Sequence, residues 1–307
     1  MILVAGGTGF VGAAIVRELS RRGRHVGVLT RNADQKRDRF PGLSVEYRQA
    51  NVREPESVAA ALAGVNAVIG CQQFPNSPIE NPTRGYTFAE VDAEGTKNLV
   101  AAAREAGVKR YVYLSGAGAA TDAERHWFRV KAQAEQVVRE SGIPYVIFRP
   151  SWVYGPEDRA LNRFLSMARF LPFVPLIGAI GKQRMQPVFV DDVARAVAEA
   201  LDNPAVNNQT LEIGGPEVLT MAEVVRTALA AAGKRRLLLP VPKSAMKLAA
   251  FVLQFAPGRT LTPDAVEFIT GDALADPTKV EQALGVKMTP LREALATYLG
   301  RRGGPRA

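Results

Sequence analysis

The stretch Ile2–Gly12, ILVAGGTGFVG, decides the fold of this chain. Four apolar residues suited to a buried strand precede three glycines, Gly6, Gly9 and Gly12, and a helical pattern follows them. Glycine permits a tight turn and a close approach of the backbone to a ligand, while the N-terminus of the next helix offers unpaired N–H groups to an anion. In this context the spacing predicts a Rossmann-type domain whose glycine loop holds the pyrophosphate of a dinucleotide.

Short apolar runs alternate with longer amphipathic stretches over the first 150 residues, a pattern typical of βαβ units around a parallel sheet. We therefore predict an α/β fold with a doubly wound parallel Rossmann sheet, whose ligand crevice lies at the carboxyl ends of the strands. The predicted strands are Ile2–Ala5, His25–Thr30, Ser44–Arg48, Ala67–Gly70, Arg110–Ser115 and Pro144–Arg149. The clearest predicted helices are Gly12–Arg21, Pro55–Ala61, Glu94–Ala106 and Val130–Ser141.

The pattern changes after about residue 155 to mixed segments punctuated by proline and glycine. A return strand at Thr210–Ile213 is expected to complete the first sheet. The predicted NAD(P)-binding Rossmann domain thus covers 1–155 plus about 188–214. The remaining stretches, about 156–187 and 215–307, are expected to form a smaller, mainly helical C-terminal lobe for a substrate or a partner, interleaved with the core in sequence.

Composition excludes several classes of protein. Cys71 is the only cysteine, and His25 and His126 are the only histidines, so no metal site is expected. The net charge is +9, but the basic residues are not accompanied by a nucleic-acid-binding motif, and no nucleic-acid partner is expected. No apolar run reaches the roughly 18 residues of a membrane span. Because the first strand opens at Met1, we expect a cytoplasmic protein, with peripheral membrane contact as the alternative.

The residues after the second predicted strand bear on the choice of nucleotide. NAD-preferring sites usually place an acid there to hold the ribose hydroxyls. This chain has Thr30-Arg31-Asn32 instead, and Arg31 can pair with a 2′-phosphate and stack on adenine. NADP(H) is therefore favoured, with NAD(H) as the alternative. Asn51 and Val52, after the third strand, are placed to meet adenine, although Asn51 is almost as well placed to cap a helix.

Five motifs, the glycine loop among them, resemble the atypical members of the extended short-chain dehydrogenase/reductase superfamily, of the epimerase/dehydratase-like and NmrA-like kind. They are GGTGFVG at Gly6–Gly12, VDAEGTKNLV at Val91–Val100, YLSGAGA at Tyr113–Ala119, FRPSWVYGP at Phe148–Pro156 and FVDDVARA at Phe189–Ala196. Two later stretches, Ile213–Val225 and Leu261–Ile269, are most similar to the group of the nucleotide-binding accessory subunit of respiratory complex I.

The resemblance implies a catalytic Tyr-x-x-x-Lys signature, and the chain departs from it. Lys131 occupies the lysine position, but Trp127 stands where the tyrosine should be, and an indole N–H has no useful acidity. His126 is a poor substitute if the stretch is helical, because a shift of one residue turns a side chain by about 100°. Ser115 matches the serine position and would orient a carbonyl. Lys131 and Ser115 are therefore the candidate catalytic residues, with Lys131 more a ribose ligand than a catalyst.

The resemblance also places loop residues beside the nicotinamide. Gln72 lies where the chain passes the nicotinamide ribose, and Pro150 and Val153 belong to the loop that packs beside the carboxamide. The complete set of expected nucleotide-binding residues is Gly6, Thr8, Gly9, Phe10, Val11, Gly12, Arg31, Asn51, Val52, Gln72, Lys131, Pro150 and Val153.

Residues 243–255, KSAMKLAAFVLQF, form an amphipathic helical pattern with Met246, Phe251, Val252 and Phe255 available to one apolar region. We expect these residues to pack in the core of the lobe. A surface for a protein partner or a membrane interface is the alternative.

Two functions follow from these residues. In the first, the chain is an NADP(H)-binding oxidoreductase that reduces a hydrophobic carbonyl or quinone-like substrate without the usual tyrosine. In the second, the bound nucleotide is structural or redox-sensing, and the chain is an accessory or assembly protein of a respiratory complex. A sugar-nucleotide epimerase or dehydratase is a third candidate, disfavoured because that chemistry needs the tyrosine.

Overall fold

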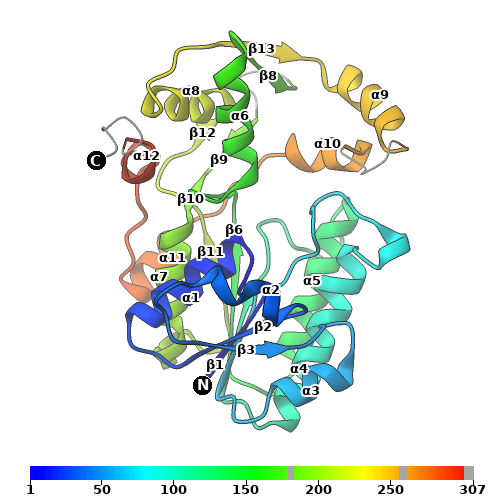
Figure 1. Ribbon diagram of the computed structural model, residues 1–307, viewed down its shortest axis with the longest axis vertical. Coiled ribbons are helices and arrows are strands. Elements are labelled where there is room, and N and C mark those ends of the chain that lie inside the picture. The colour runs from blue at the N-terminus through cyan, green and yellow to red at the C-terminus, as the bar shows by residue number, and fades with distance from the viewer. Residues whose placement is uncertain (179–182, 256–260, 301–307) are drawn as a thin grey trace.

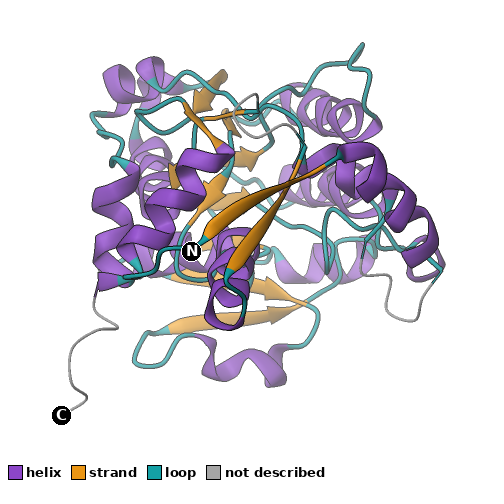
Figure 2. Cartoon of the chain, turned by 90° about the horizontal axis from the view of Figure 1, so that it is seen from above, coloured by secondary structure: helices purple, strands orange, loops and turns teal. Residues whose placement is uncertain are grey.

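The computed structural model describes residues 1–178, 183–255 and 261–300. A parallel sheet with helices on both faces forms one half of the molecule, the lower half in Figure 1. A second, mainly helical part lies beyond the carboxyl ends of the strands and fills the upper half. Figure 2 looks down on this arrangement from above.

Seven strands form the main sheet, in the order β11-β6-β5-β4-β1-β2-β3, and every neighbouring pair is parallel. All predicted strands are confirmed, with ends that differ by no more than one residue. Their bounds are β1 Ile2–Ala5, β2 Val26–Thr30, β3 Val45–Gln49, β4 Ala67–Gly70, β5 Arg110–Leu114, β6 Tyr145–Pro150 and β11 Gln209–Ile213.

Helices cover both faces of this sheet, so the central strands are buried on both sides and consist almost wholly of apolar residues. Alternate residues of β1 enter different cores: Val4 packs with one face's helices and Leu3 with the other's. On the Val4 side lie α1 Phe10–Arg21 and α7 Val190–Asp202. On the Leu3 side lie α3 Pro55–Ala61, α4 Gly95–Glu105 and α5 His126–Arg139. The predicted helix Val130–Ser141 thus begins four residues earlier, at His126.

Short helices connect these elements. They are α2 Ala33–Lys36, and the 3-10 turns η1 Arg37–Arg39, η2 Pro82–Arg84 and η4 Pro204–Val206. A π-helix, η3 Phe88–Glu94, leads directly into α4 and carries Asp92 inward. Since π-turns are rare and often occur at functional sites, this segment bears on the site below.

The order of the strands reverses at β1, which has β2 on one side and β4 on the other. The connections leaving β1 and β4 therefore run to opposite sides, and a crevice opens between them at their carboxyl ends. The glycine loop follows β1 at this point. The doubly wound Rossmann sheet predicted from the sequence is confirmed.

The upper part of Figure 1 contains helices and three two-stranded sheets. β8 pairs with β13 in parallel, β9 with β12 antiparallel, and β7 with β10 in parallel. The strands are β7 Val153–Tyr154, β8 Phe173–Ile177, β9 Arg184–Met185, β10 Val188–Phe189, β12 Leu219–Thr220 and β13 Leu237–Val241. The helices there are α6 Arg159–Phe170, α8 Met221–Ala231, α9 Lys243–Leu253, α10 Pro263–Ile269 and α12 Leu291–Tyr298, while α11 Thr278–Leu284 lies beside α7 and β11 in the lower half. Both α11 and α12 contribute to the core on the α1 and α7 side of the sheet.

The expectation that residues 243–255 pack in a core is wrong. Of α9 only Ala250 is buried, while Phe251, Val252 and Phe255 are 57%, 66% and 76% exposed. The helix is held instead through Lys243 and Lys247, whose ammonium groups bind Glu267 of α10. Among the described residues, no helix has both the length and the apolar character needed to cross a membrane.

Gly12 should be intolerant of any side chain. A Cβ atom there would overlap the carbonyl of Gly6 and lie 2.8 Å from Cα of Gly7, both backbone atoms of the glycine loop. We expect Gly12→Ala to lower the free energy of unfolding by about 1–3 kcal/mol, because the overlap forces the helix away from the turn. Denaturant unfolding measures this. Gly116→Ala is the control, since a Cβ at Gly116 meets nothing within 4 Å; an equal loss in both variants would contradict the steric argument.

Candidate nucleotide site

The glycine loop provides a backbone surface with no side chain in the way. Gly6 has φ of +83°, and a Cβ there would lie 2.6 Å from the carbonyl oxygen of Cys71, so the loop packs directly on the chain leaving β4. The N–H of Gly9 donates to the Gly6 carbonyl at 2.9 Å, which closes the turn. Gly9 then caps α1 without a side-chain hydrogen bond, and the first turn of α1 contains no acid. The positive end of α1 therefore faces the crevice, as a pyrophosphate requires.

Three arginines lie near the loops that follow β1, β2 and β3. The guanidinium of Arg31 lies 5.2 Å from the ring centre of Tyr86, and that of Arg53 lies 5.6 Å from it. Arg39 reaches the loop itself, donating from Nε to the carbonyl of Thr8 at 3.3 Å. Arg39, Arg53 and Tyr86 were missed by the sequence analysis. The first two could have been found as basic residues that closely follow β2 and β3, but Tyr86 comes from a distant loop.

Asn51 has its side chain engaged within its own loop. Its Nδ2 donates to Glu54 Oε1 at 2.6 Å, and its Oδ1 accepts from the backbone N–H of Arg53 at 3.3 Å. Asn51 does not cap a helix, the alternative considered for it, because the N-cap of α3 is Glu54. Val52 is buried against the start of α4, where its methyl group would lie 2.8 Å from a Cβ on Gly95.

The residues expected beside the nicotinamide follow β4 and β6. Gln72 is buried, and its Nε2 donates to Thr96 Oγ1 of α4 at 2.9 Å. Its Oε1 is buried without a hydrogen-bond partner among the described residues. Pro150 ends β6, and its carbonyl accepts from Ala117 at 2.9 Å. Val153 begins β7, half-buried.

Lys131 is held in a buried ion pair. Its Nζ lies 2.5 Å from Oδ1 of Asp92 in the π-helix, and Asp92 is fully buried. Burial disfavours the charged lysine, but the carboxylate of Asp92 and the nearby Tyr113 outweigh it and raise the pKa of Lys131. Burial also raises the pKa of Tyr113 to about 12. Lys131 is thus held by a buried carboxylate, although burial also raises the pKa of Asp92. The sequence analysis did not identify Asp92.

Trp127, at the position of the tyrosine, lies in an aromatic cluster between the two parts of the molecule. Its ring centre lies 5.3 Å from that of Phe268 on α10 and 5.2 Å from that of His126. Trp127 is buried. His126 is the first residue of α5, and its Nε2 lies 3.1 Å from Oε2 of Glu80. The chain is thus helical at His126, the condition under which the sequence makes this residue a poor substitute for the tyrosine.

Ser115 is bound to a buried carboxylate. Its Oγ donates to Oε1 of Glu135 at 2.6 Å, and Glu135 is fully buried. Arg149 of β6 donates to both oxygens of Glu135, at 2.8 and 2.7 Å, and Arg139 donates to one at 2.7 Å. Burial alone would raise the pKa of Glu135, but Arg149, Ser115 and Arg139 together lower it. The serine hydroxyl therefore helps to fix α5 onto the sheet.

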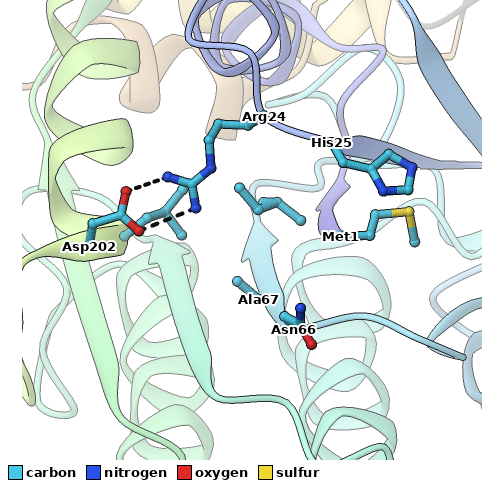
Figure 3. A pocket seen from close by; sticks show the side chains of 8 residues that line it. Met1, Arg24, His25, Asn66, Ala67 and Asp202 are labelled. Carbon is cyan, nitrogen blue, oxygen red and sulfur yellow. Dashed lines mark hydrogen bonds and ion pairs between the residues drawn. The ribbon is translucent and has the colours of Figure 1, made fainter.

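A cavity of about 300 Å³ lies at the opposite edge of the sheet from the glycine loop. It opens at the amino ends of β1 and β4, among Met1, His25 and Asn66, and Figure 3 shows that the ion pair of Arg24 with Asp202 closes one side. It does not adjoin the glycine loop. The candidate site is therefore the crevice at the carboxyl ends of the strands.

The fold, the glycine loop and the retained serine and lysine positions define an atypical short-chain dehydrogenase/reductase. The chain belongs to the NAD(P)H-binding family, whose model matches residues 6–204. The match includes the glycine loop from Gly6 onward and the elements of the sheet and its helices as far as α7. Both the family and the geometry of the loop therefore support NAD(P)H binding.

Two groups of relatives are similar over most of the chain. NADH dehydrogenase [ubiquinone] 1 alpha subcomplex subunit 9 from rat is 30% identical over 94% of this chain and 76% of its own length. The Arabidopsis thaliana subunit of the same name is 33% identical over 72% of this chain. The matched region covers 55% of the length of that subunit. NAD(P)H azoreductase from Xenophilus azovorans is 30% identical over 76% of this chain and 74% of its own length. The resemblance to the complex I accessory subunit group is confirmed.

Solved structures share the fold over the full length. The Thermus thermophilus UDP-glucose 4-epimerase complex with NAD superimposes with a TM-score of 0.74 at 26% identity, covering 99% of each chain. The upper, mainly helical part of this protein is therefore included in the likeness, not only the Rossmann sheet.

Glu135 should contribute strongly to stability at neutral pH. We expect Glu135→Gln to lower the free energy of unfolding by about 3–5 kcal/mol, since Arg149 and Arg139 lose their buried counterion. Because the pKa of Glu135 is lower in the folded chain than its ordinary 4.5, this contribution is complete above about 4.5 and is lost as pH falls through the lowered value.

Denaturant unfolding over a pH series measures the effect. Glu140→Gln, on an exposed residue one turn further along, is the control and should stay within about 0.5 kcal/mol of the wild type. The prediction is contradicted if the difference in free energy of unfolding between the wild type and Glu135→Gln increases as the pH is lowered.

Proposed function

We propose that this chain is an NADP(H)-binding protein that lacks tyrosine-based acid–base catalysis and retains its nucleotide as a structural or redox-sensing ligand of an accessory protein. The single observation that carries the proposal is that all three positions of the usual catalytic signature make buried contacts of another kind. Trp127 packs against Phe268, Lys131 pairs with Asp92, and Ser115 donates to Glu135.

The physical argument concerns proton transfer. Reduction of an ordinary carbonyl by hydride needs an acid near the developing alkoxide. An indole N–H does not supply one, and the hydroxyl of Ser115 already donates its hydrogen bond to a carboxylate. Lys131 remains charged, but its nearest partner is the buried carboxylate of Asp92, which would have to be left unpaired if the ammonium turned to a substrate.

The preference for NADP(H) is supported by the arginines on the adenosine side. Arg31 directly follows β2, where NAD-specific sites place an acid, and Arg53 stacks on the same tyrosine ring. Two guanidinium groups beside one aromatic ring form a suitable site for a phosphate monoester next to a stacked base.

The accessory role is supported by the likeness to subunits of NADH dehydrogenase [ubiquinone], proteins whose names describe components of a larger assembly. The lobe would then contact a protein partner, while the nucleotide stabilises the Rossmann part that carries it.

A second candidate is hydride transfer to an acceptor that needs no protein acid. The likeness to NAD(P)H azoreductase favours it. A quinone or an azo compound takes up hydride from NADPH to give an anion of the reduced acceptor and NADP⁺, and water can supply the remaining proton. In this version the crevice needs only to bind nicotinamide and acceptor in contact.

Arg31→Ala should weaken NADPH selectively. Loss of one charge-assisted contact with the 2′-phosphate costs about 1–3 kcal/mol, or about 5- to 150-fold in Kd, while NADH affinity stays unchanged. Calorimetric titration of both nucleotides measures this. Arg37→Ala, which removes an exposed arginine paired with Asp34 nearby, should change neither. Equal weakening of both nucleotides by Arg31→Ala would contradict the assignment.

Turnover separates the two candidate functions. With NADPH and either menadione or methyl red, we expect NADPH to be oxidised no faster with the protein than without it, and the nucleotide to copurify by mass spectrometry. Clear turnover that Lys131→Gln abolishes while NADPH affinity persists would refute the non-catalytic function. Turnover that survives both Lys131→Gln and Ser115→Ala would instead support hydride transfer without a protein acid.

A further inference from the structure

The excess positive charge of the chain is concentrated in two segments, 159–178 and 234–255. The whole chain has 39 basic and 30 acidic residues. These two segments contain eight of the basic residues and no acidic residue, which leaves 31 basic and 30 acidic residues elsewhere. The basic residues are Arg159, Arg163, Arg169, Lys234, Arg235, Arg236, Lys243 and Lys247. Nearly all of the net charge of +9 therefore belongs to one part of the lobe.

The same two segments expose most of the large apolar side chains on the surface. Of the 14 such residues among the described part of the chain, ten lie in 159–178 or 234–255. They are Phe170, Leu171, Phe173, Leu237, Leu239, Leu248, Phe251, Val252, Leu253 and Phe255. Single exposed apolar residues are ordinary, but a concentration of this kind marks an interaction surface.

The two segments are brought together by the pairing of β8 with β13. Phe173 lies opposite Leu237 in this pair, and Arg236 donates from Nε to the carbonyl of Ala168 near the end of α6 at 3.0 Å. The pairing thus joins the two segments that contain these basic and apolar residues. Figure 1 shows β8, β13 and α9 at the upper end, remote from the Rossmann sheet.

Helix α9 presents an apolar stripe to solvent. Leu248, Phe251, Val252 and Phe255 follow the spacing of one helix face, and each is more than half exposed. The opposite side holds the helix to α10, where Lys243 binds Glu267 at 2.7 Å. The apolar stripe is therefore free while the helix itself is anchored.

We propose that this end of the lobe, residues 159–178 and 234–255, binds the surface of a bilayer that contains anionic lipids. Helices with apolar residues on one face and lysine or arginine beside them lie in the membrane interface, where basic residues attract anionic head groups. A fluid surface suits side chains that protrude from three separate elements, because it needs no complementary shape. A second copy of the same face is a poor occupant, since each copy brings eight basic residues to the contact, of which Lys243 and Lys247 are paired with the acid Glu267.

Vesicle flotation of the full chain tests this inference, which is independent of the proposed function. The wild type should float with vesicles of phosphatidylcholine and phosphatidylglycerol, less so at high salt, and remain unbound with phosphatidylcholine alone. Phe251→Gln combined with Phe255→Gln should abolish flotation. Lys234→Gln combined with Arg235→Gln should weaken it by about tenfold or more. All variants should bind NADPH like the wild type, which shows that they are folded.

Matched control substitutions lie outside the surface. Leu43→Gln with Val218→Gln removes two exposed apolar residues, and Arg104→Gln with Lys109→Gln removes two exposed charges; both should float like the wild type. The inference fails if the wild type does not float, or if the surface variants float as well as the controls. It also fails if light scattering shows that the wild type is a dimer that does not bind vesicles, and that the variant with both Phe251→Gln and Phe255→Gln is a monomer. In that case the face joins two copies of the chain.

Discussion

The contact between backbone atoms at Gly6 and Gly12 is the constraint on which the rest of the structure depends. It fixes the start of α1 directly over the end of β1, and the loop in turn rests on the backbone that leaves β4. No side chain fits into either contact, so the crevice between β1 and β4 opens beside bare backbone and the amino end of a helix. The candidate nucleotide site lies beside this turn, at the point where the strand order reverses.

Two buried carboxylates bind the residues at the positions that the resemblance assigned to catalysis. A buried carboxylate needs charged or hydrogen-bonding partners, because desolvation otherwise disfavours its ionised form. Asp92 takes Lys131 as its partner, and Glu135 takes Ser115 together with two arginines. Each pairing uses a residue that the resemblance assigned to catalysis. A serine or lysine at a family position therefore does not by itself indicate catalysis, because the neighbouring side chains determine which hydrogen bonds and ion pairs it makes.

The sequence predicted the sheet almost completely and the site only in part, for a physical reason. Strands and helices follow from local periodicity and glycine spacing, which one stretch of chain contains within itself. The partners of Lys131 and Ser115 lie 39 and 20 residues away and meet them only in the folded chain. Helix α9 shows the limit most clearly. Its spacing correctly predicted a helix with an apolar face, but periodicity does not say whether another part of the chain covers that face.

The lobe and the Rossmann part meet where the catalytic tyrosine would have stood, and the same junction holds α9. Arg125, next to the start of α5, donates to the carbonyl of Glu267 at 2.8 Å, while the Glu267 carboxylate binds Lys243 and Lys247 of α9. Those two lysines lower the pKa of Glu267 to about 2, so the carboxylate stays ionised at any physiological pH and the junction persists. Phe268, the next residue, packs on Trp127. Where the family has an acidic tyrosine hydroxyl, Trp127 thus makes an apolar contact with Phe268. This contact joins the nucleotide-binding half to the lobe.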